Sequence, residues 1–326
     1  MGQPFLAVLF ALLFAAALST AQSQKPSPPI RVNVNRVNVG VTVTDSAGHF
    51  VEGLHREDFQ IFDNDVEQPI TDFLPVAEPA QLLLLIESGP AVLLFSKSHL
   101  LAADALLTTI APTDRVALAS YSKTPHLLLD FTTNKTEARL ELQNINFSND
   151  FAELNLSSSL ASAIDWLAHL PGKKTIVLLS TGVDSSPPDD PQAIQRKLLI
   201  SDIRILAVSL SADFRKPAKK HKKLSPQERS NRAALKGEFA EADQSLRELS
   251  ALTGGRVYFP SNADEFHRTY AEIAQLVRHE YSLAFAPPVA DGQLHSLKVK
   301  TKNASYQVAH RQAYLAPPQS NREAIP

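Results

Sequence analysis

The first regular pattern in the chain is a series of apolar residues at every second position. Valine recurs in this way through residues 32–44, and a period of two is typical of a strand with one buried face. A change of phase near Asn35 fits a β-bulge. Turn-forming residues at 45–48 and at Asn64–Asp65 separate further short apolar segments. The pattern therefore predicts a small N-terminal β segment over residues 32–75.

From Ala80 onward, continuous apolar runs of strand length alternate with amphipathic stretches. Runs such as residues 82–86 and 176–179 are typical of strands that are buried on both faces of a parallel sheet. This alternation predicts a doubly wound α/β domain, whose ligands normally bind at the carboxyl ends of the strands. We predict strands at residues 81–86, 116–121, 127–131, 174–180, 203–210 and 256–259, and helices at residues 96–110, 135–145, 157–170, 192–200, 238–252 and 263–278.

The last part of the chain returns to β character. Residues 281–286, 296–301 and 306–314 read as strands, with a turn at Asp291–Gly292. These strands either extend the α/β sheet or cross back to complete the N-terminal β segment. We favour the second arrangement, because neither short β segment has enough strands to be stable alone. The predicted fold class is therefore α/β, with a doubly wound, mainly parallel, Rossmann-like sheet and a smaller flanking β-sandwich-like domain.

The N-terminus resembles a secretion signal. An apolar stretch at residues 5–18 is followed by Ser19 and Ala21, which fit a cleavage site before Gln22. We expect an exported protein, periplasmic or secreted. An uncleaved membrane anchor is the alternative, because no Lys or Arg precedes the apolar stretch. The predicted division is a signal peptide at 1–21, a Pro-rich connector at 22–31, β segments at 32–75 and 281–315 that pack together, an α/β domain at 80–280 with a basic insertion at 213–236, and a tail at 316–326.

Composition excludes several function classes. The 326 residues carry 32 Lys and Arg against 34 Asp and Glu, and this net charge of −2 argues against a nucleic-acid partner. The absence of cysteine excludes thiol nucleophiles, disulfide scaffolds and Cys-type zinc sites. No G-x-S-x-G, H-E-x-x-H, P-loop or G-x-G-x-x-G motif is present. We therefore predict a non-enzymatic protein, with an extracytoplasmic hydrolase that uses an unrecognised Ser/His/Asp site as the alternative.

One strand end carries a family resemblance. Residues 82–89 read LLLLIESG, and together with the order of elements this segment resembles a von Willebrand factor type A (VWA) domain, in which the first strand ends in D-x-S-G-S. The secreted VWFA-related family of acidobacterial type is resembled by residues 39–45, 51–59, 281–287, 291–292 and 311–314. The resemblance implies an adhesion-type module that binds a protein or another cell-envelope macromolecule through loops at the carboxyl edge of the sheet.

VWA domains hold Mg²⁺ or Mn²⁺ with an Asp and two Ser from D-x-S-x-S, a Thr from a second loop and a later Asp. Here Ile86 replaces the first Asp, Pro90 the second Ser and Thr181 the later Asp. Ser88 keeps a hydroxyl, and so does Ser158, or Ser157 with a slip of one residue. Without direct carboxylate ligands, hydroxyls alone cannot offset the dehydration of a small dication. This degenerate metal-ion-dependent adhesion site predicts no cofactor, with Mg²⁺ or Mn²⁺ as the alternative.

The residues around the degenerate site are the first candidates for partner binding. Glu87 adjoins the first ligand position, and strand alternation should direct its side chain away from the side of Ile86 and Ser88. Asp184 lies three positions after Thr181. Each residue also has an ordinary role open to it, in a tight turn or as a helix cap. The predicted partner-binding rim is Glu87, Ser88, Gly89, Ser158, Thr181 and Asp184.

The insertion at residues 213–236 is strongly basic. It holds nine Lys and Arg against two acidic residues. Such a run is either a solvated loop or a patch for an anionic partner. As a patch it would bind anionic polysaccharide or lipid headgroups, and export argues against nucleic acid. The candidate residues are Lys216, Lys219, Lys220, Lys222 and Lys223.

Overall fold

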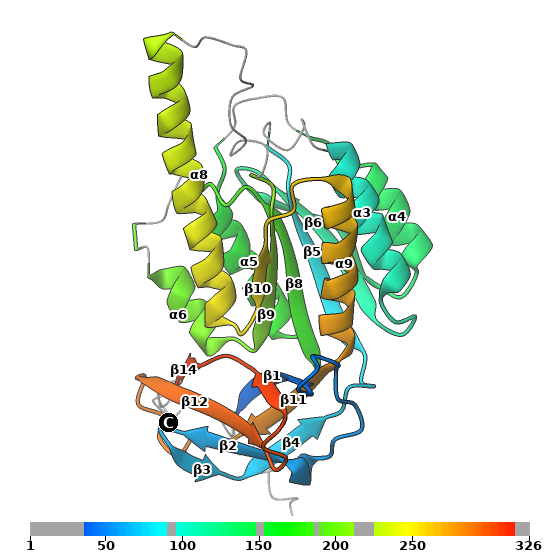
Figure 1. The fold of residues 1–326 in the computed structure, drawn as a ribbon, viewed down its shortest axis with the longest axis vertical. Coiled ribbons are helices and arrows are strands. Elements are labelled where there is room, and N and C mark those ends of the chain that lie inside the picture. The colour runs from blue at the N-terminus through cyan, green and yellow to red at the C-terminus, as the bar shows by residue number, and fades with distance from the viewer. Residues whose placement is uncertain are drawn as a thin grey trace, which may run out of the picture. The chain divides into compact units, whose positions relative to one another are not determined.

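The computed structural model describes residues 36–89, 96–147, 153–185, 189–190, 192–211 and 225–316 (Figure 1). Several sequence predictions lie outside these residues. They are the signal peptide at 1–21, the connector at 22–31, Pro90, most of the tail, and the candidate lysines Lys216, Lys219, Lys220, Lys222 and Lys223.

A six-stranded sheet forms the centre of the α/β domain. Its strand order is β10-β9-β8-β5-β6-β7, and every neighbouring pair is parallel except β6 and β7. This is the doubly wound order, with β5 and β8 adjacent where the winding reverses. The predicted fold class is confirmed. The strands are β5 (Ala80–Glu87), β6 (Arg115–Tyr121), β7 (Pro125–Thr132), β8 (Lys173–Ser180), β9 (Ile203–Ser209) and β10 (Arg256–Tyr258).

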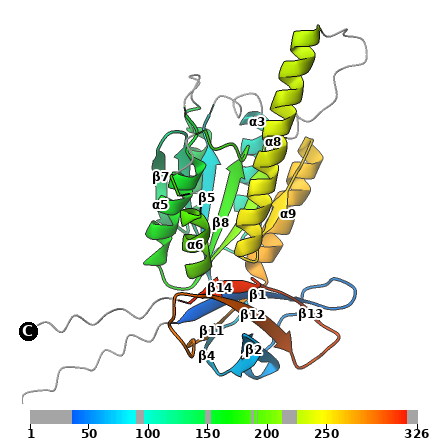
Figure 2. The same cartoon turned by 90° about the vertical axis from the view of Figure 1, so that its left-hand side faces the viewer.

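Helices cover both faces of this sheet (Figures 1 and 2). Alternate residues of β5 enter two separate cores, Leu82 and Leu84 in one and Leu83 and Leu85 in the other. All eight residues of β5 are buried, which explains its continuous apolar sequence. The first core is closed by α3 (Ser96–Thr109), α4 (Lys135–Gln143) and α9 (Ala263–Arg278), and the second by α5 (Leu156–Ala168), α6 (Ala193–Ile200) and α8 (Pro226–Leu252).

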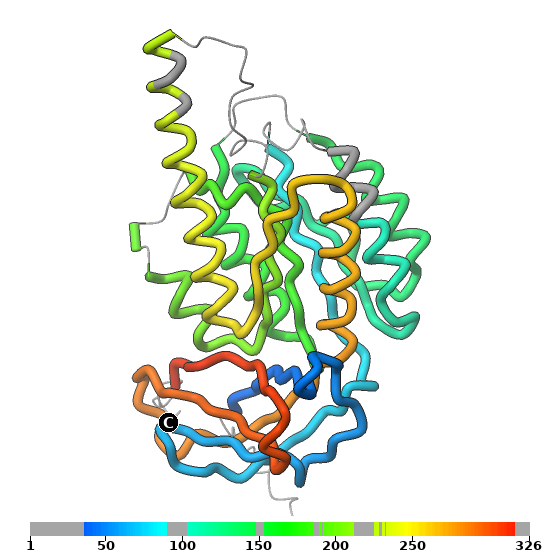
Figure 3. Tube along the Cα trace, viewed as in Figure 1, coloured from blue at the N-terminus to red at the C-terminus, as the bar shows by residue number. Residues whose placement is uncertain are grey.

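One predicted boundary is wrong. The helix expected from Glu238 begins at Pro226 and has 27 residues, so the second half of the basic insertion is helical. The segment contains mostly good helix formers, with a proline at the first helical position. The high charge of residues 226–236 is also compatible with a solvated loop, so the sequence alone does not predict this part of the helix. The described side chains from Ser225 to Glu238 are exposed, and this part of α8 extends past the strands (Figure 3).

Strands from both ends of the described chain build the smaller β domain. Every pairing in it is antiparallel. Strand β12 pairs with β2 from Leu297–Asp63 to Thr301–Phe59. The two sheets have the orders β13-β1-β11-β4 and β14-β12-β2-β3, from β1 (Val37–Thr44), β2 (Phe59–Asp63), β3 (Val66–Gln68), β4 (Ile70–Leu74), β11 (Glu280–Phe285), β12 (Leu294–Thr301), β13 (Gln307–Ala309) and β14 (Ala313–Leu315).

Local chemistry explains two features of this β domain. Asn64 and Asp65, between β2 and β3, have φ angles of 47° and 63°, which a two-residue hairpin of type I′ requires. The core between the two sheets is apolar, and it includes Val39, Val41, Ile61 and Leu283. The alternation of valines along β1 thus reflects one face that packs into this core.

Buried polar contacts join the β domain to the α/β domain. Arg204 and Glu280 form an ion pair of 2.9 Å with both side chains almost fully buried. Arg311 donates hydrogen bonds to the backbone oxygens of Ser201 at 2.6 Å and Asn38 at 2.8 Å. Arg204 lies near the start of β9. The β domain therefore contacts the amino-terminal edge of the six-stranded sheet, opposite the edge where parallel strands place ligand sites.

Candidate functional site

The loops at the carboxyl edge of the sheet meet through backbone hydrogen bonds. The N–H of Ser88 donates to Tyr121 O, and that of Ser185 donates to Leu154 O, both at 2.8 Å. Gly89 lies against the side chain of Leu154. The ends of β5, β6 and β8 and the start of α5 therefore converge, because parallel strands end at one edge. Five of the predicted rim residues, Glu87, Ser88, Gly89, Thr181 and Asp184, belong to these loops.

The carboxylate of Glu87 is completely buried and is hydrogen-bonded on both oxygens. The Thr181 N–H donates to Oε2 at 2.7 Å, and the Thr181 hydroxyl lies 2.9 Å from Oε1 and 2.8 Å from Oε2. The Ser180 hydroxyl donates to Oε2 at 3.0 Å. The Tyr121 hydroxyl lies 2.6 Å from Ser180 Oγ and 3.3 Å from Glu87 Oε2. Glu87 is thus bound to the neighbouring strands of its own sheet.

The electrostatics of this network follow from its burial. Burial raises the pKa of Glu87, and the hydrogen bonds from Thr181, Ser180 and Tyr121 partly offset this rise. Burial and the adjacent Glu87 carboxylate hold the pKa of Tyr121 well above its usual value. Tyr121 therefore keeps its proton. A fully paired network of this kind fixes the positions of the loops rather than exposing a reactive group.

Of the remaining rim residues, Ser88 makes a hydrogen bond within the protein and Ser158 is exposed to solvent. The hydroxyl of Ser88 donates to Tyr121 O at 3.0 Å. The helix cap of α5 is Asn155, whose side chain accepts from the N–H of Ser158 at 3.2 Å. The helix-cap role considered for Ser158 is therefore wrong, because Asn155 occupies the N-cap position and Ser158 already lies inside the helix. Ser158 itself is exposed at the carboxyl edge.

A dication of the kind that the resemblance implies does not fit these residues. Such an ion needs several oxygen ligands, including carboxylates. Ile86 offers no oxygen and lies in the apolar core. The Glu87 oxygens are occupied by donors of the chain itself. Within the described part of the chain, no group of three or more His, Asp or Glu could hold a metal ion.

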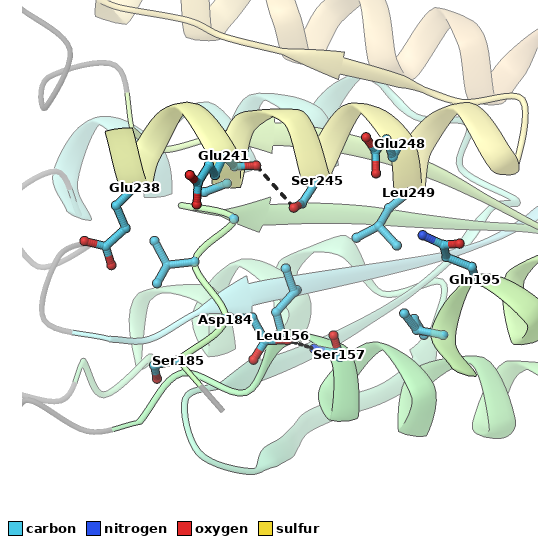
Figure 4. Close-up of a pocket in the computed structure, with 14 residues that line it drawn as sticks. Leu156, Ser157, Asp184, Ser185, Gln195, Glu238, Glu241, Ser245, Glu248 and Leu249 are labelled. Atoms are coloured by element: carbon cyan, nitrogen blue, oxygen red, sulfur yellow. Dashed lines mark hydrogen bonds between the residues drawn. The ribbon is translucent and has the colours of Figure 1, made fainter. Parts of the chain in front are cut away.

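Asp184 contacts the start of α5 rather than the Glu87 network. Its Oδ2 accepts a hydrogen bond of 2.9 Å from the N–H of Ser157, whereas Oδ1 is buried without a hydrogen-bond partner. Both residues line a groove of about 400 Å³ between α5, α6 and α8 (Figure 4). Gly182 and Ala242 also line the groove. Glycine is required at position 182, because its φ is 80° and a Cβ there would lie 2.7 Å from the backbone oxygen of Ala242.

Several site residues were missed by sequence reasoning. Tyr121 and Ser180 complete the Glu87 network, but each is only the polar end of an apolar strand in the sequence. Asp243 on α8 is buried and accepts hydrogen bonds from the Ser209 and Ser211 hydroxyls, both at 2.9 Å. These bonds attach α8 to the end of β9. The other described charged residues of α8 are exposed, so no local sequence signal distinguishes this buried acid from them.

Comparison with known proteins gives distant similarity. No protein-family model matches the chain, and no curated protein matches it. Among solved structures, proximal thread matrix protein 1 from the mussel byssus has a TM-score of 0.44 at 10% identity, over 61% of this chain and 48% of that one. BatB from Bacteroides thetaiotaomicron has a TM-score of 0.39 at 10% identity, over 61% of this chain and 97% of BatB.

A third structure, three N-terminal domains of the type V pili tip protein Mfa5 from Porphyromonas gingivalis, has a TM-score of 0.30 at 18% identity, over 49% of this chain and 28% of that one. This chain spans about half the length of the byssus protein. Likenesses this weak carry no functional inference, so function is inferred below from the residues of the site. None of the helices that the structure describes is long and apolar enough to cross a membrane.

Proposed function

We propose that the protein is an exported, non-enzymatic interaction module with a VWA-like α/β domain. It binds a protein or another macromolecule of the cell envelope through the loops at the carboxyl edge of the six-stranded sheet. Binding does not require Mg²⁺ or Mn²⁺. In this arrangement the β domain contacts the opposite edge of the sheet and supports the α/β domain without covering the binding loops.

The single observation that carries this proposal is the state of Glu87. Its carboxylate is buried, and its donors are Ser180 at the end of β8, Thr181 directly after it and Tyr121 at the end of β6. Removing these donors to bind a cation would leave buried polar groups unpaired, at a cost of about 1–3 kcal/mol each. The hydrogen bonds of Glu87 therefore hold the loops at this edge in place, and the exposed loop residues are free to contact a partner.

Metal independence is tested with the mature chain, residues 22–326. Isothermal titration calorimetry and thermal unfolding are measured with millimolar Mg²⁺ and Mn²⁺. We expect neither saturable heat nor a shift in the unfolding temperature. Saturable binding that is lost in Ser88→Ala or Glu87→Gln would contradict the proposal and would restore a metal-dependent mechanism.

Partner binding is tested by capture from the cell envelope in the presence of Mg²⁺ and, separately, of EDTA. Ser158→Arg places a bulky charge at the exposed carboxyl edge, and Ser46→Arg makes the same change at an exposed turn of the β domain. We expect the Ser158 variant to lose the captured partner under both conditions and the Ser46 variant to retain it. Equal capture by both variants, or turnover of a hydrolase substrate panel by the wild type, would refute the proposed interface.

A further inference from the structure

Two neighbouring grooves run along the surface between α6 and α8. The first lies at the carboxyl edge and includes Asp184, and the second reaches the β domain at Gln312 and Ala313. Both grooves are lined by Gln195 of α6 and Glu248 of α8. Because they share these two residues, they lie next to each other, and we call the pair the α6–α8 groove.

The α6–α8 groove has an apolar floor. Near the carboxyl edge the floor includes Val183 and Leu249, and near the β domain it includes Leu199 and Leu252. All four side chains are half-buried, so each presents part of its apolar surface to the groove. Apolar surface of this kind is stabilised when a partner side chain covers it.

Carboxylates line the groove, and no Lys, Arg or His is among the described residues that line it. The acidic residues are Asp184, Glu238, Glu241 and Glu248, and none of them makes an ion pair with a described residue. Glu248 accepts a hydrogen bond of 2.9 Å from Gln244, and Asp184 Oδ1 is buried without a donor. A buried acceptor without a partner is rare in folded proteins. Because this oxygen has almost no accessible surface, a molecule in the groove would meet Asp184 through Oδ2, which already accepts from the Ser157 N–H.

We infer that the α6–α8 groove binds a basic peptide segment of a partner protein. Lys or Arg side chains of the segment pair with Asp184, Glu238 and Glu241, and apolar side chains that follow them cover Leu199 and Leu252. Charge complementarity favours this occupant. The four carboxylates make no ion pair with a described residue, so they would repel an acidic segment and would stay without a cation beside an uncharged one. The inference rests on the proposed function and names both the partner chemistry and the surface.

The dimensions set the length of the segment. From Glu238 to Leu252 the α8 axis rises by about 21 Å at 1.5 Å per residue. An extended peptide covers this distance with about six or seven residues at 3.3 Å each. The recognised unit is therefore short, with its basic residues toward the carboxyl edge of the sheet.

The test begins with selection of twelve-residue peptides from a random displayed library on the full mature chain, in the presence of EDTA. We expect enrichment of peptides with two or more Lys or Arg followed by apolar residues. The enriched peptide is labelled with fluorescein, and its affinity is measured by anisotropy for the wild type, the double variant Glu238→Lys/Glu241→Lys and the control Glu57→Lys. Glu238→Lys and Glu241→Lys alter the groove, whereas Glu57→Lys makes the same change at an exposed position in the β domain.

The expected result is at least a tenfold loss of affinity in the double variant Glu238→Lys/Glu241→Lys and no change in Glu57→Lys. Three results would overturn the inference: enrichment of peptides without basic residues, equal affinity in all variants, or tighter peptide binding after deletion of residues 214–223. The last result would assign the groove to the protein's own basic segment. If Ser158→Arg abolishes partner capture while the double variant does not, this inference fails and the proposed function stands.

Discussion

The buried pair between Arg204 and Glu280 provides a quantitative test of how the two domains are joined. Arg204 on β9 is 5% exposed and Glu280 at the start of β11 is 4% exposed. Their charged atoms are 2.9 Å apart, and Arg204 also donates to the hydroxyl of Thr42 at 3.3 Å. Burial raises the pKa of Glu280, and the attraction of Arg204 and Lys173 opposes this rise. The carboxylate therefore depends on its cationic neighbours.

Replacement of Arg204 by Met leaves a buried carboxylate without its closest partner. Breaking a buried pair in this way costs about 3–5 kcal/mol. Lys173 donates to the Glu280 backbone oxygen at 3.2 Å and still attracts the side chain, so we expect the lower end, about 3 kcal/mol at pH 7. The double replacement Arg204→Met/Glu280→Met removes both charges. It should recover stability to within about 1 kcal/mol of the wild type, because apolar residues of similar volume often substitute for a buried pair.

The assay is urea unfolding followed by far-ultraviolet circular dichroism, from which the free energy of unfolding is obtained by linear extrapolation. In Arg204→Met the folded-state pKa of Glu280 rises further above the unfolded value. The deficit relative to wild type should therefore be largest at pH 7 and should shrink as the pH falls through the raised folded-state pKa of Glu280 toward its ordinary value of 4.5. A loss under about 1 kcal/mol at pH 7, or a double variant less stable than Arg204→Met, would refute this account of the junction.

Three further predictions concern single positions. Gly255→Ala should destabilise the fold by about 3 kcal/mol or more in urea unfolding, because a Cβ would lie 1.7 Å from the backbone oxygen of Ile205. Burial lowers the pKa of His295, but two aspartate partners outweigh this effect and leave it raised. Its contribution to stability should be complete below pH 6.5 and decline as the pH rises through the folded-state pKa, and His295→Asn should flatten a thermal-unfolding pH profile. Thr181→Val should cost about 1–3 kcal/mol by calorimetry, because it removes a hydroxyl donor from buried Glu87; an unchanged unfolding temperature would contradict this.

Element order and fold class could be predicted from the sequence because hydrophobic periodicity is a local property. The continuous apolar run of β5 reports burial on both faces, and the alternating valines of β1 report burial on one. Helix ends were less predictable. The start of α8 was misplaced by twelve residues, from Glu238 to Pro226, because high charge is compatible with both a loop and an exposed helix.

The candidate site was only partly predictable. Motif alignment indicated the loss of ligands at Ile86 and Thr181, since it depends on residue type at known spacing. It could not indicate that Glu87 would be bound by Thr181, which is 94 positions away in the sequence. Strand alternation gave the side of the sheet on which Glu87 points, but the donors on that side belong to other strands.

The sequence by itself determined most of the segments that become strands and helices, and it places Ile86 and Thr181 where the VWA resemblance would expect carboxylate metal ligands. Tertiary structure decided which polar groups face one another. The α6–α8 groove exists because α6 and α8 lie side by side, and Arg204 meets Glu280 because β11 returns to the amino-terminal edge of the sheet. The physical reason is that secondary structure follows from short-range periodicity, whereas pairing of buried charges and shaping of grooves depend on contacts between residues far apart in the chain.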